Sequence, residues 1–234
     1  MNIDNIKHII WDWNGTIIDD FSAALESINT MLGEHDLPVI DGMKYRDVFT
    51  FPIKDCYIEL GFDLAKDSEW TRISQRFHDI YASNWHKVIV RKGMPELLIF
   101  LSDNGIRHHI LSASEIGRLE RQLKDLKIRD YFSSVYGLSD IYGSSKVDQG
   151  LRLLADLEIH PSEVIMIGDT IHDYEVASEM GIQCLLLSIG HQAEWRLKAC
   201  ACPRVDSIGS LQDMFIPPVT AEALKLEMAG PCVM

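Results

Sequence analysis

The sequence predicts an α/β fold in which a parallel sheet is covered by helices on both faces and carries a helical insert. Beyond residue 93, short apolar runs alternate with helical segments joined by short loops, which is typical of parallel strands connected by helices. Between residues 20 and 87 the pattern is helical and is broken only by loops. This stretch is therefore expected to be an all-helical insert.

The first predicted elements are a strand and a helix. His8–Trp11 is a brief apolar run that stops at polar residues and a glycine, which is typical of a buried strand leading into a loop. In residues 20–32 the apolar side chains recur at helical spacing and predict a helix. Breaks at Leu37-Pro38, Phe51-Pro52 and Gly61-Phe62 divide the rest of the insert.

Helices and strands then alternate along the chain. The first of these helices is delimited by a proline near its start and by Asn-Gly at its end. The predicted order is a helix over 93–104, a strand over 107–111, a helix around 119–126, a strand over 134–137, a helix over 146–157, a strand over 164–167, a helix over 174–180 and a strand over 184–187.

The composition is that of an ordinary globular protein, with 234 residues, 47% hydrophobic and 24% charged, and a net charge of −13. The negative charge argues against binding to nucleic acid or to anionic membranes, but a local cationic site can still hold a small anionic substrate. No apolar run approaches the ~20 residues that span a bilayer, and Met1–Asn5 lack the pattern of a signal peptide. The five cysteines include no Cys-x-x-Cys pair, which favours reduced thiols and a cytoplasmic protein.

Polar residues gather where the predicted strands end. In a parallel α/β sheet, ligands bind beyond the carboxyl ends of the strands. At these positions the sequence places three aspartates, an asparagine, a serine and a lysine, which are Asp12, Asn14, Ser112, Lys146, Asp169 and Asp173. Their convergence from four separate segments predicts a functional site at this edge of the sheet.

These residues resemble the motifs of the haloacid dehalogenase-like hydrolase superfamily. The matching pieces are Asp12-Trp13-Asn14-Gly15-Thr16, Ser112, Lys146 and Gly168–Asp173, in the family's order and spacing. The helical insert lies where this family places one type of cap, and the chain is most similar to the phosphoglycolate phosphatase-like branch. The resemblance implies a Rossmann-like core over 1–16 and 88–215, a helical cap over 17–87 and a C-terminal tail over 216–234.

The resemblance also implies a mechanism. Asp12 would be the nucleophile and would form an aspartyl-phosphate that water later hydrolyses. Mg²⁺ would be held by Asp12, Asp169, the backbone carbonyl of Asn14 and, directly or through water, Asp173. Together with Lys146, the three aspartates and Mg²⁺ would sum to a neutral site before substrate enters.

The phosphate group of the substrate has its own set of expected contacts. Lys146 would neutralise the phosphoryl oxygens, and Ser112 would donate a hydrogen bond to one of them. Gly15 allows the backbone to approach closely, and the neighbouring N–H groups at Thr16 and Ala113 are expected to cradle the phosphate.

Asn14 departs from the family pattern, because phosphatases of this family usually have a second aspartate there that serves as the general acid. An amide has no proton to exchange near neutral pH, and general acid–base help is typically worth ~10²–10⁴-fold. Three explanations stay open. Another group, such as His172, supplies the proton; the enzyme prefers good leaving groups, such as aryl or acyl phosphates, or a different reaction; or Asn14 is an engineered change that traps a substrate complex.

We therefore predict Mg²⁺-dependent hydrolysis of a small phosphorylated metabolite by a monomer or homodimer. One alternative, which Asn14 favours, is a phospho-ligand binding or regulatory protein with weak turnover. A C–halogen hydrolase is disfavoured, because dehalogenation on this scaffold needs no metal and would leave the Asp169/Asp173 pair without a role. A phosphonate hydrolase would need a Schiff-base lysine in the cap, where the candidates are Lys44, Lys54, Lys66 and Lys87.

Two features of the insert have two interpretations each. Arg46, Lys54 and Arg72 form either a second anion site or, more simply, ordinary surface charge. The segment Phe49–Pro52 is either a loop that closes over the site or a turn between cap helices.

Overall fold

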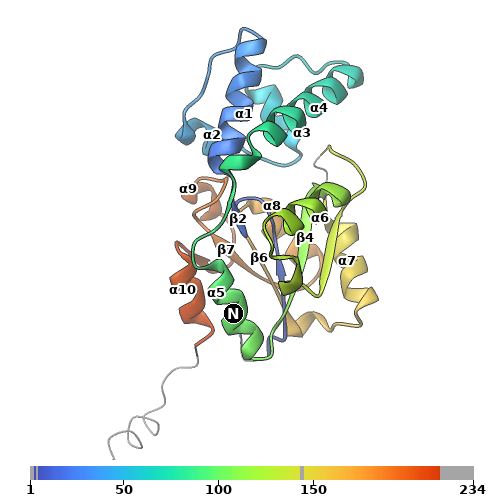
Figure 1. Cartoon of the computed structure of the whole chain (residues 1–234), viewed down its shortest axis with the longest axis vertical. Coiled ribbons are helices and arrows are strands. Elements are labelled where there is room, and N and C mark those ends of the chain that lie inside the picture. The colour runs from blue at the N-terminus through green and yellow to red at the C-terminus, as the bar shows by residue number, and fades with distance from the viewer. Residues whose placement is uncertain (1–2, 4, 143–144, 217–234) are drawn as a thin grey trace, which may run out of the picture.

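The computed structural model describes residues 3, 5–142 and 145–216, and its centre is a six-stranded parallel sheet (Figure 1). The strand order is β5-β4-β1-β6-β7-β8. The strands are β1 (His8–Trp11), β4 (Arg107–Glu115), β5 (Ser134–Leu138), β6 (Val164–Gly168), β7 (Gln183–Leu187) and β8 (Arg204–Val205). All neighbouring pairs are parallel, so the carboxyl ends of the strands lie at one edge of the sheet.

Helices cover both faces of this sheet and pack against its apolar side chains. Ile9 and Trp11 pack with the helices of one face, and Ile10, between them in β1, packs with those of the other. The first face carries α5 (Met94–Asp103), α6 (Ile116–Asp125) and α10 (Ile208–Met214), and the second carries α7 (Val147–Asp156), α8 (Ile171–Glu179) and α9 (Glu194–Leu197). Short 3₁₀ turns occupy Trp85–Lys87, Arg129–Tyr131 and Pro161–Glu163.

The insert between β1 and α5 forms a helical cap at one end of the sheet (Figure 1). Its helices are α1 (Phe21–Glu34), α2 (Gly42–Val48), α3 (Ile53–Glu59) and α4 (Asp67–Ser83). Two short antiparallel strands, β2 (Ile18–Asp19) and β3 (Ile89–Val90), join the cap to the core. The predicted fold class, a parallel α/β core with an inserted helical cap, is confirmed, whereas the residue boundaries assigned to core and cap stay a prediction.

Several element boundaries differ from those the sequence predicts. Strand β4 runs on to Glu115, so Ser112 lies inside the strand, beside an irregularity in its pairing with β5. Helix α8 begins at Ile171, because Thr170 caps it in a box with Asp173. The short elements β2, β3, β8, α9 and α10 were not predicted, since a few residues do not establish a period.

Apart from Ile216, the predicted C-terminal tail lies outside the described residues. No helix among the residues that the structure describes is long and apolar enough to cross a membrane.

Candidate active site

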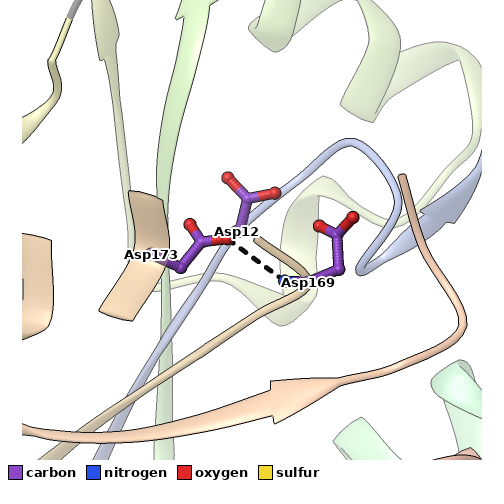
Figure 2. A group of neighbouring side chains, drawn as sticks. All are labelled: Asp12, Asp169 and Asp173. Carbon is purple, nitrogen blue, oxygen red and sulfur yellow. Dashed lines mark hydrogen bonds between the residues drawn. The ribbon is translucent and has the colours of Figure 1, made fainter. Parts of the chain in front are cut away.

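The parallel register brings Asp12 and Asp169 together. Trp11 pairs with Ile167 in the neighbouring strand, so the residues that follow β1 and β6 leave the sheet side by side. The backbone N–H of Asp12 still donates to the carbonyl of Ile167 (2.9 Å). Figure 2 shows the carboxyl groups of Asp12, Asp169 and Asp173 grouped at this edge, and their nearest oxygens lie within 4.8 Å of one another.

Lys146 places one positive charge among these carboxylates. It stands at the start of α7 and its side chain is almost fully buried. Its ammonium group hydrogen-bonds Asp12 and the carbonyl of Leu111 (3.1 Å) and lies 2.8 Å from Oδ1 of Asp173. Burial lowers the pKa of Lys146, but the two carboxylates more than reverse this and raise it, so the lysine is a permanent cation.

One lysine does not balance three aspartates. Burial, with the neighbouring aspartates, raises the pKa of Asp12 to about 8 even though Lys146 opposes the shift. Burial likewise raises the pKa of Asp169 to about 6, although His191 opposes it. Buried carboxylates that resist ionisation in this way are the donor set that a divalent cation stabilises. Among the described residues, Asp12, Asp169 and Asp173 are the one group of acidic, histidine or cysteine side chains that lie close enough together to hold a metal ion. They therefore fit a metal such as Mg²⁺.

Asp169 is held from several sides. Its Oδ1 accepts from the hydroxyl of Thr16 (3.0 Å), and its Oδ2 accepts from the backbone N–H of His191 (2.6 Å). Gly15, with φ of 75°, and Gly190 pass so close that a Cβ on either would collide with this carboxylate. The glycine after Asn14 therefore serves the packing of the Asp169 carboxylate.

Asp173 has both of the roles that its position suggests. Its Oδ2 accepts from the backbone N–H groups of Asp169 (3.1 Å) and Thr170 (2.9 Å), which caps α8. Its Oδ1 faces Lys146 and accepts no other hydrogen bond. One oxygen therefore fixes the helix while the other faces the charged cluster.

Some of the predicted site residues line a cavity of about 160 Å³, and the others do not. The residues that line it are Asp12, Asn14, Ser112, Ala113, Lys146 and Asp173. Gly15, Thr16 and Asp169 do not line it. The hydroxyl of Thr16 donates to Asp169, and its backbone N–H donates to the carbonyl of Trp13 (3.3 Å), so neither donor of Thr16 is left for the predicted phosphate contact.

Asn14 is fixed in one orientation by its neighbours. Its amide nitrogen donates to Oδ2 of Asp20 (2.7 Å) and to the hydroxyl of Tyr81 (3.2 Å). Its amide oxygen accepts from the hydroxyl of Ser114 (3.1 Å). Since donor and acceptor both have partners, Asn14 is a fully satisfied part of the site.

Asp20 is the centre of this second polar group. It also accepts from the backbone N–H of Gly15 (2.9 Å), from the hydroxyl of Tyr81 (2.8 Å) and from Nε2 of His191 (3.0 Å). Burial opposes ionisation of Asp20, but His191 and these hydrogen bonds outweigh it and lower its pKa. Conversely, burial lowers the pKa of His191, and Asp20 more than reverses this.

Three residues of this group were not predicted from the sequence. Asp20 lies between β2 and α1, Tyr81 lies in α4, and His191 lies in the loop after β7. Their spacing along the chain follows no motif. The one available signal was Asp20 itself, an acidic residue immediately before an apolar helical face.

Other candidate residues lie elsewhere. His172 stacks on Phe51 with ring centroids 4.6 Å apart, does not line the main cavity, and has its pKa lowered by burial to about 4. Arg46 lies 3.7 Å over the ring of Phe21, while Lys54 and Arg72 pair with cap carboxylates. Among the described lining residues, Lys146 is the only lysine, so no cap lysine is placed for Schiff-base chemistry.

Known proteins are similar to this chain in sequence and in fold. The profile of the family described as "Haloacid dehalogenase-like hydrolase" matches residues 9–187. An N-acetylmuramic acid 6-phosphate phosphatase of Pseudomonas aeruginosa is 27% identical over 192 residues, covering 80% of this chain and 83% of the relative. Tyrosine-protein kinase PtkA of Mycobacterium tuberculosis is 26% identical over 184 residues, which cover 78% of this chain but only 62% of that relative's length. Phosphoglycolate phosphatases are among the further relatives.

A solved structure gives the same fold. A haloacid dehalogenase-like hydrolase from Streptococcus pneumoniae superposes with a TM-score of 0.79 at 22% identity, covering 91% of this chain and 99% of its own. Because the family profile matches well over half of the sequence, the chain belongs to the haloacid dehalogenase-like hydrolase family. The prediction of a hydrolase of this family is thereby confirmed.

Proposed function

We propose that this protein hydrolyses a small-molecule phosphate monoester, with Mg²⁺, through an aspartyl-phosphate on Asp12. The observation that carries the proposal is Lys146, buried against Asp12 and Asp173 in the wall of the cavity. A charge-paired carboxylate facing a cavity is the arrangement that a nucleophile toward a phosphate dianion requires, since both partners are anionic.

Asp12, Asp169, the backbone carbonyl of Asn14 and Asp173, directly or through water, would hold Mg²⁺. When bound, the metal supplies charge neutralisation between nucleophile and phosphate. The side chains do the rest: an Asp12 oxygen attacks phosphorus, the bond to the ester oxygen breaks, and Lys146 balances charge on the phosphoryl oxygens. Water then attacks the phosphorus and releases inorganic phosphate and free Asp12.

Ser112 would donate a hydrogen bond to one phosphoryl oxygen, since its hydroxyl faces the cavity and accepts from the backbone N–H of Ser114 (3.1 Å). The backbone N–H of Ala113 would complete the cradle, whereas the N–H groups of Gly15 and Thr16, also predicted to contact phosphate, already donate to Asp20 and to the carbonyl of Trp13. The relatives named as phosphatases support this assignment. Membership of the phosphoglycolate phosphatase-like branch, a small metabolite as the partner, a monomeric or dimeric state and a cytoplasmic location belong to the proposal.

Asn14 favours one second candidate, a protein that binds a phosphorylated ligand and turns it over weakly. The amide cannot donate a proton to a departing alkoxide. Its side chain is instead hydrogen-bonded to Asp20, Tyr81 and Ser114.

Phosphate release from phenyl phosphate and from ethyl phosphate, with Mg²⁺ or with a chelator, tests the assignment. Multiple turnovers that need Mg²⁺ and are lost in Asp12→Asn support the phosphatase. Mg²⁺-dependent binding of inorganic phosphate without turnover of either ester would support the second candidate and contradict the first.

A further inference from the structure

The cavity above the aspartates has two chemically different sides. The core side presents Asp12, Lys146, Asp173 and Ser112. The cap side presents seven aromatic rings, which are Tyr45, Phe49, Phe51, Tyr57, Trp70, Phe77 and Tyr81. These seven residues are the aromatic wall. Any ester whose phosphate lies at Asp12 must place its organic group toward this wall.

The rings of the wall hold one another in place. Tyr57 meets Trp70 edge-on at 5.5 Å between ring centroids and Phe77 edge-on at 6.3 Å. Phe77 in turn stacks on Tyr81 at 5.8 Å. Such edge-on and offset contacts are the geometries that aromatic rings prefer. The aromatic ring of a substrate would therefore make contacts of the same kind with the wall.

The wall offers little to a polar organic group. The hydroxyl of Tyr81 is already bonded to Asp20, and no lysine or arginine of the cap lines the described cavity. The one arginine that does, Arg118 of α6, hydrogen-bonds His78 of the cap.

The chemistry at Asn14 points the same way independently of the wall. A phenol has a pKa of about 10, as in tyrosine, whereas the pKa of a simple alcohol, like that of water, is several units higher. A phenolate therefore leaves without a proton donor, and an alkoxide does not. A site without a general acid is suited to the first kind of ester.

We propose that the substrate is a phosphate monoester of an aromatic hydroxyl compound, with its ring against the aromatic wall. This inference rests on the proposed phosphatase function and specifies its substrate class. The Asp12 oxygen forms a bond to phosphorus as the phosphorus–aryl oxygen bond breaks. The phenolate keeps the bonding electron pair and takes its proton from water after it departs.

Four phosphates separate the ring from the leaving group. Phenyl phosphate has both a ring and a good leaving group; benzyl phosphate has the ring with an alkoxide; acetyl phosphate has the good leaving group alone; and ethyl phosphate has neither. We expect phenyl and benzyl phosphate to share a low KM. We expect kcat to be high for phenyl and acetyl phosphate and about 10²-fold or more lower for the two alkyl esters.

A variant pair tests the wall itself. Phe77→Leu should raise KM for phenyl phosphate about fivefold, because a ring-to-ring contact is lost, while its kcat and the KM for acetyl phosphate stay unchanged. Phe100→Leu is the matched control, because Phe100 is a half-buried ring in α5 that does not line the cavity. It should leave all four substrates unaffected.

The outcomes distinguish the two levels of the proposal. If ethyl phosphate is turned over as efficiently as phenyl phosphate, or if Phe77→Leu leaves KM for phenyl phosphate unchanged, the aromatic assignment is overturned and the phosphatase stands. If none of the four phosphates is turned over with Mg²⁺, the phosphatase proposal itself fails and the aromatic assignment with it.

Discussion

The two sides of the cavity are built on opposite principles. The core side is charged. Its side chains come from strand ends and helix starts and are held in place by hydrogen bonds. The cap side is a set of aromatic rings from three helices and the loop before α3. The difference indicates that the core residues determine the reaction and that the cap residues determine which organic group of the substrate fits.

Asp12→Asn should have the largest effect. It keeps the shape of the side chain but removes the nucleophile, so turnover should fall by about 10⁴-fold or more. Steady-state phosphate release measures this. Lys146→Gln is a useful companion, because it leaves the nucleophile and removes only its cation. A smaller loss than for Asp12→Asn is expected, and equal turnover of wild type and Asp12→Asn would place the nucleophile elsewhere.

Asn14→Asp should change selectivity rather than the rate with good leaving groups. Its new carboxyl group would face Asp20, which lies 2.7 Å from the present amide nitrogen. Repulsion from that anion raises the pKa of the new group and keeps a proton on it, as a general acid needs. Turnover of ethyl phosphate should rise about 10²-fold, while phenyl phosphate changes only a few-fold. Unchanged ethyl phosphate turnover would show that the missing acid is not the limit.

The metal-free protein should lose stability as pH rises. The folded-state pKa of Asp12 is raised to about 8 from 3.8, so between these values the folded protein binds more protons than the unfolded chain. Its contribution to stability is therefore lost as pH increases across this window. We expect a fall of at least about 1 kcal/mol, or about 2–4 °C in Tm.

Thermal unfolding in a chelator between pH 5 and pH 8 measures this slope. Mg²⁺ should reduce the slope, and Asp12→Asn should reduce it without metal. A Tm that rises over this range in wild type but not in Asp12→Asn would contradict the charge imbalance at the site.

Trp195→Phe should have the smallest effect. Trp195 is 64% exposed, and its indole N–H donates to Asp47 of the cap (2.8 Å). The backbone of the loop beside it is also held by Gln192, which donates to the carbonyl of Phe49 (2.8 Å). We expect less than about 0.5 kcal/mol in urea unfolding and unchanged kcat/KM for phenyl phosphate. A large loss of activity would show that this exposed contact keeps the cap docked.

The same division explains what could be predicted from the sequence. Asp12, Lys146 and Asp169 follow or precede regular elements, and Asp173 lies in the first turn of α8, so the alternation of strands and helices was enough to bring them together. Ser112 was predicted to follow the strand, but it lies within β4, which continues to Glu115. The irregular end of this strand has no distinct sequence pattern. The fold class followed from the same alternation.

The polar group centred on Asp20 could not be predicted in this way. Asp20, Tyr81 and His191 meet only when the cap is docked on the core, and that docking depends on tertiary contacts such as Tyr45 to His191 (3.0 Å). The aromatic wall was equally hidden, because aromatic residues at helical spacing predict a core and do not indicate which of them face a cavity. The segment Phe49–Pro52, left open between loop and turn, contributes two rings to that cavity.

The most direct test of the central claim is rapid mixing with phenyl phosphate and Mg²⁺, followed by acid quenching and peptide mass analysis. Because a phenolate departs without a proton donor, the aspartyl-phosphate should form from phenyl phosphate faster than water hydrolyses it. The account predicts a burst of about one phenol per enzyme and one phosphoryl group on the peptide that contains Asp12. Steady turnover with no burst and no phosphoryl group on that peptide would contradict it.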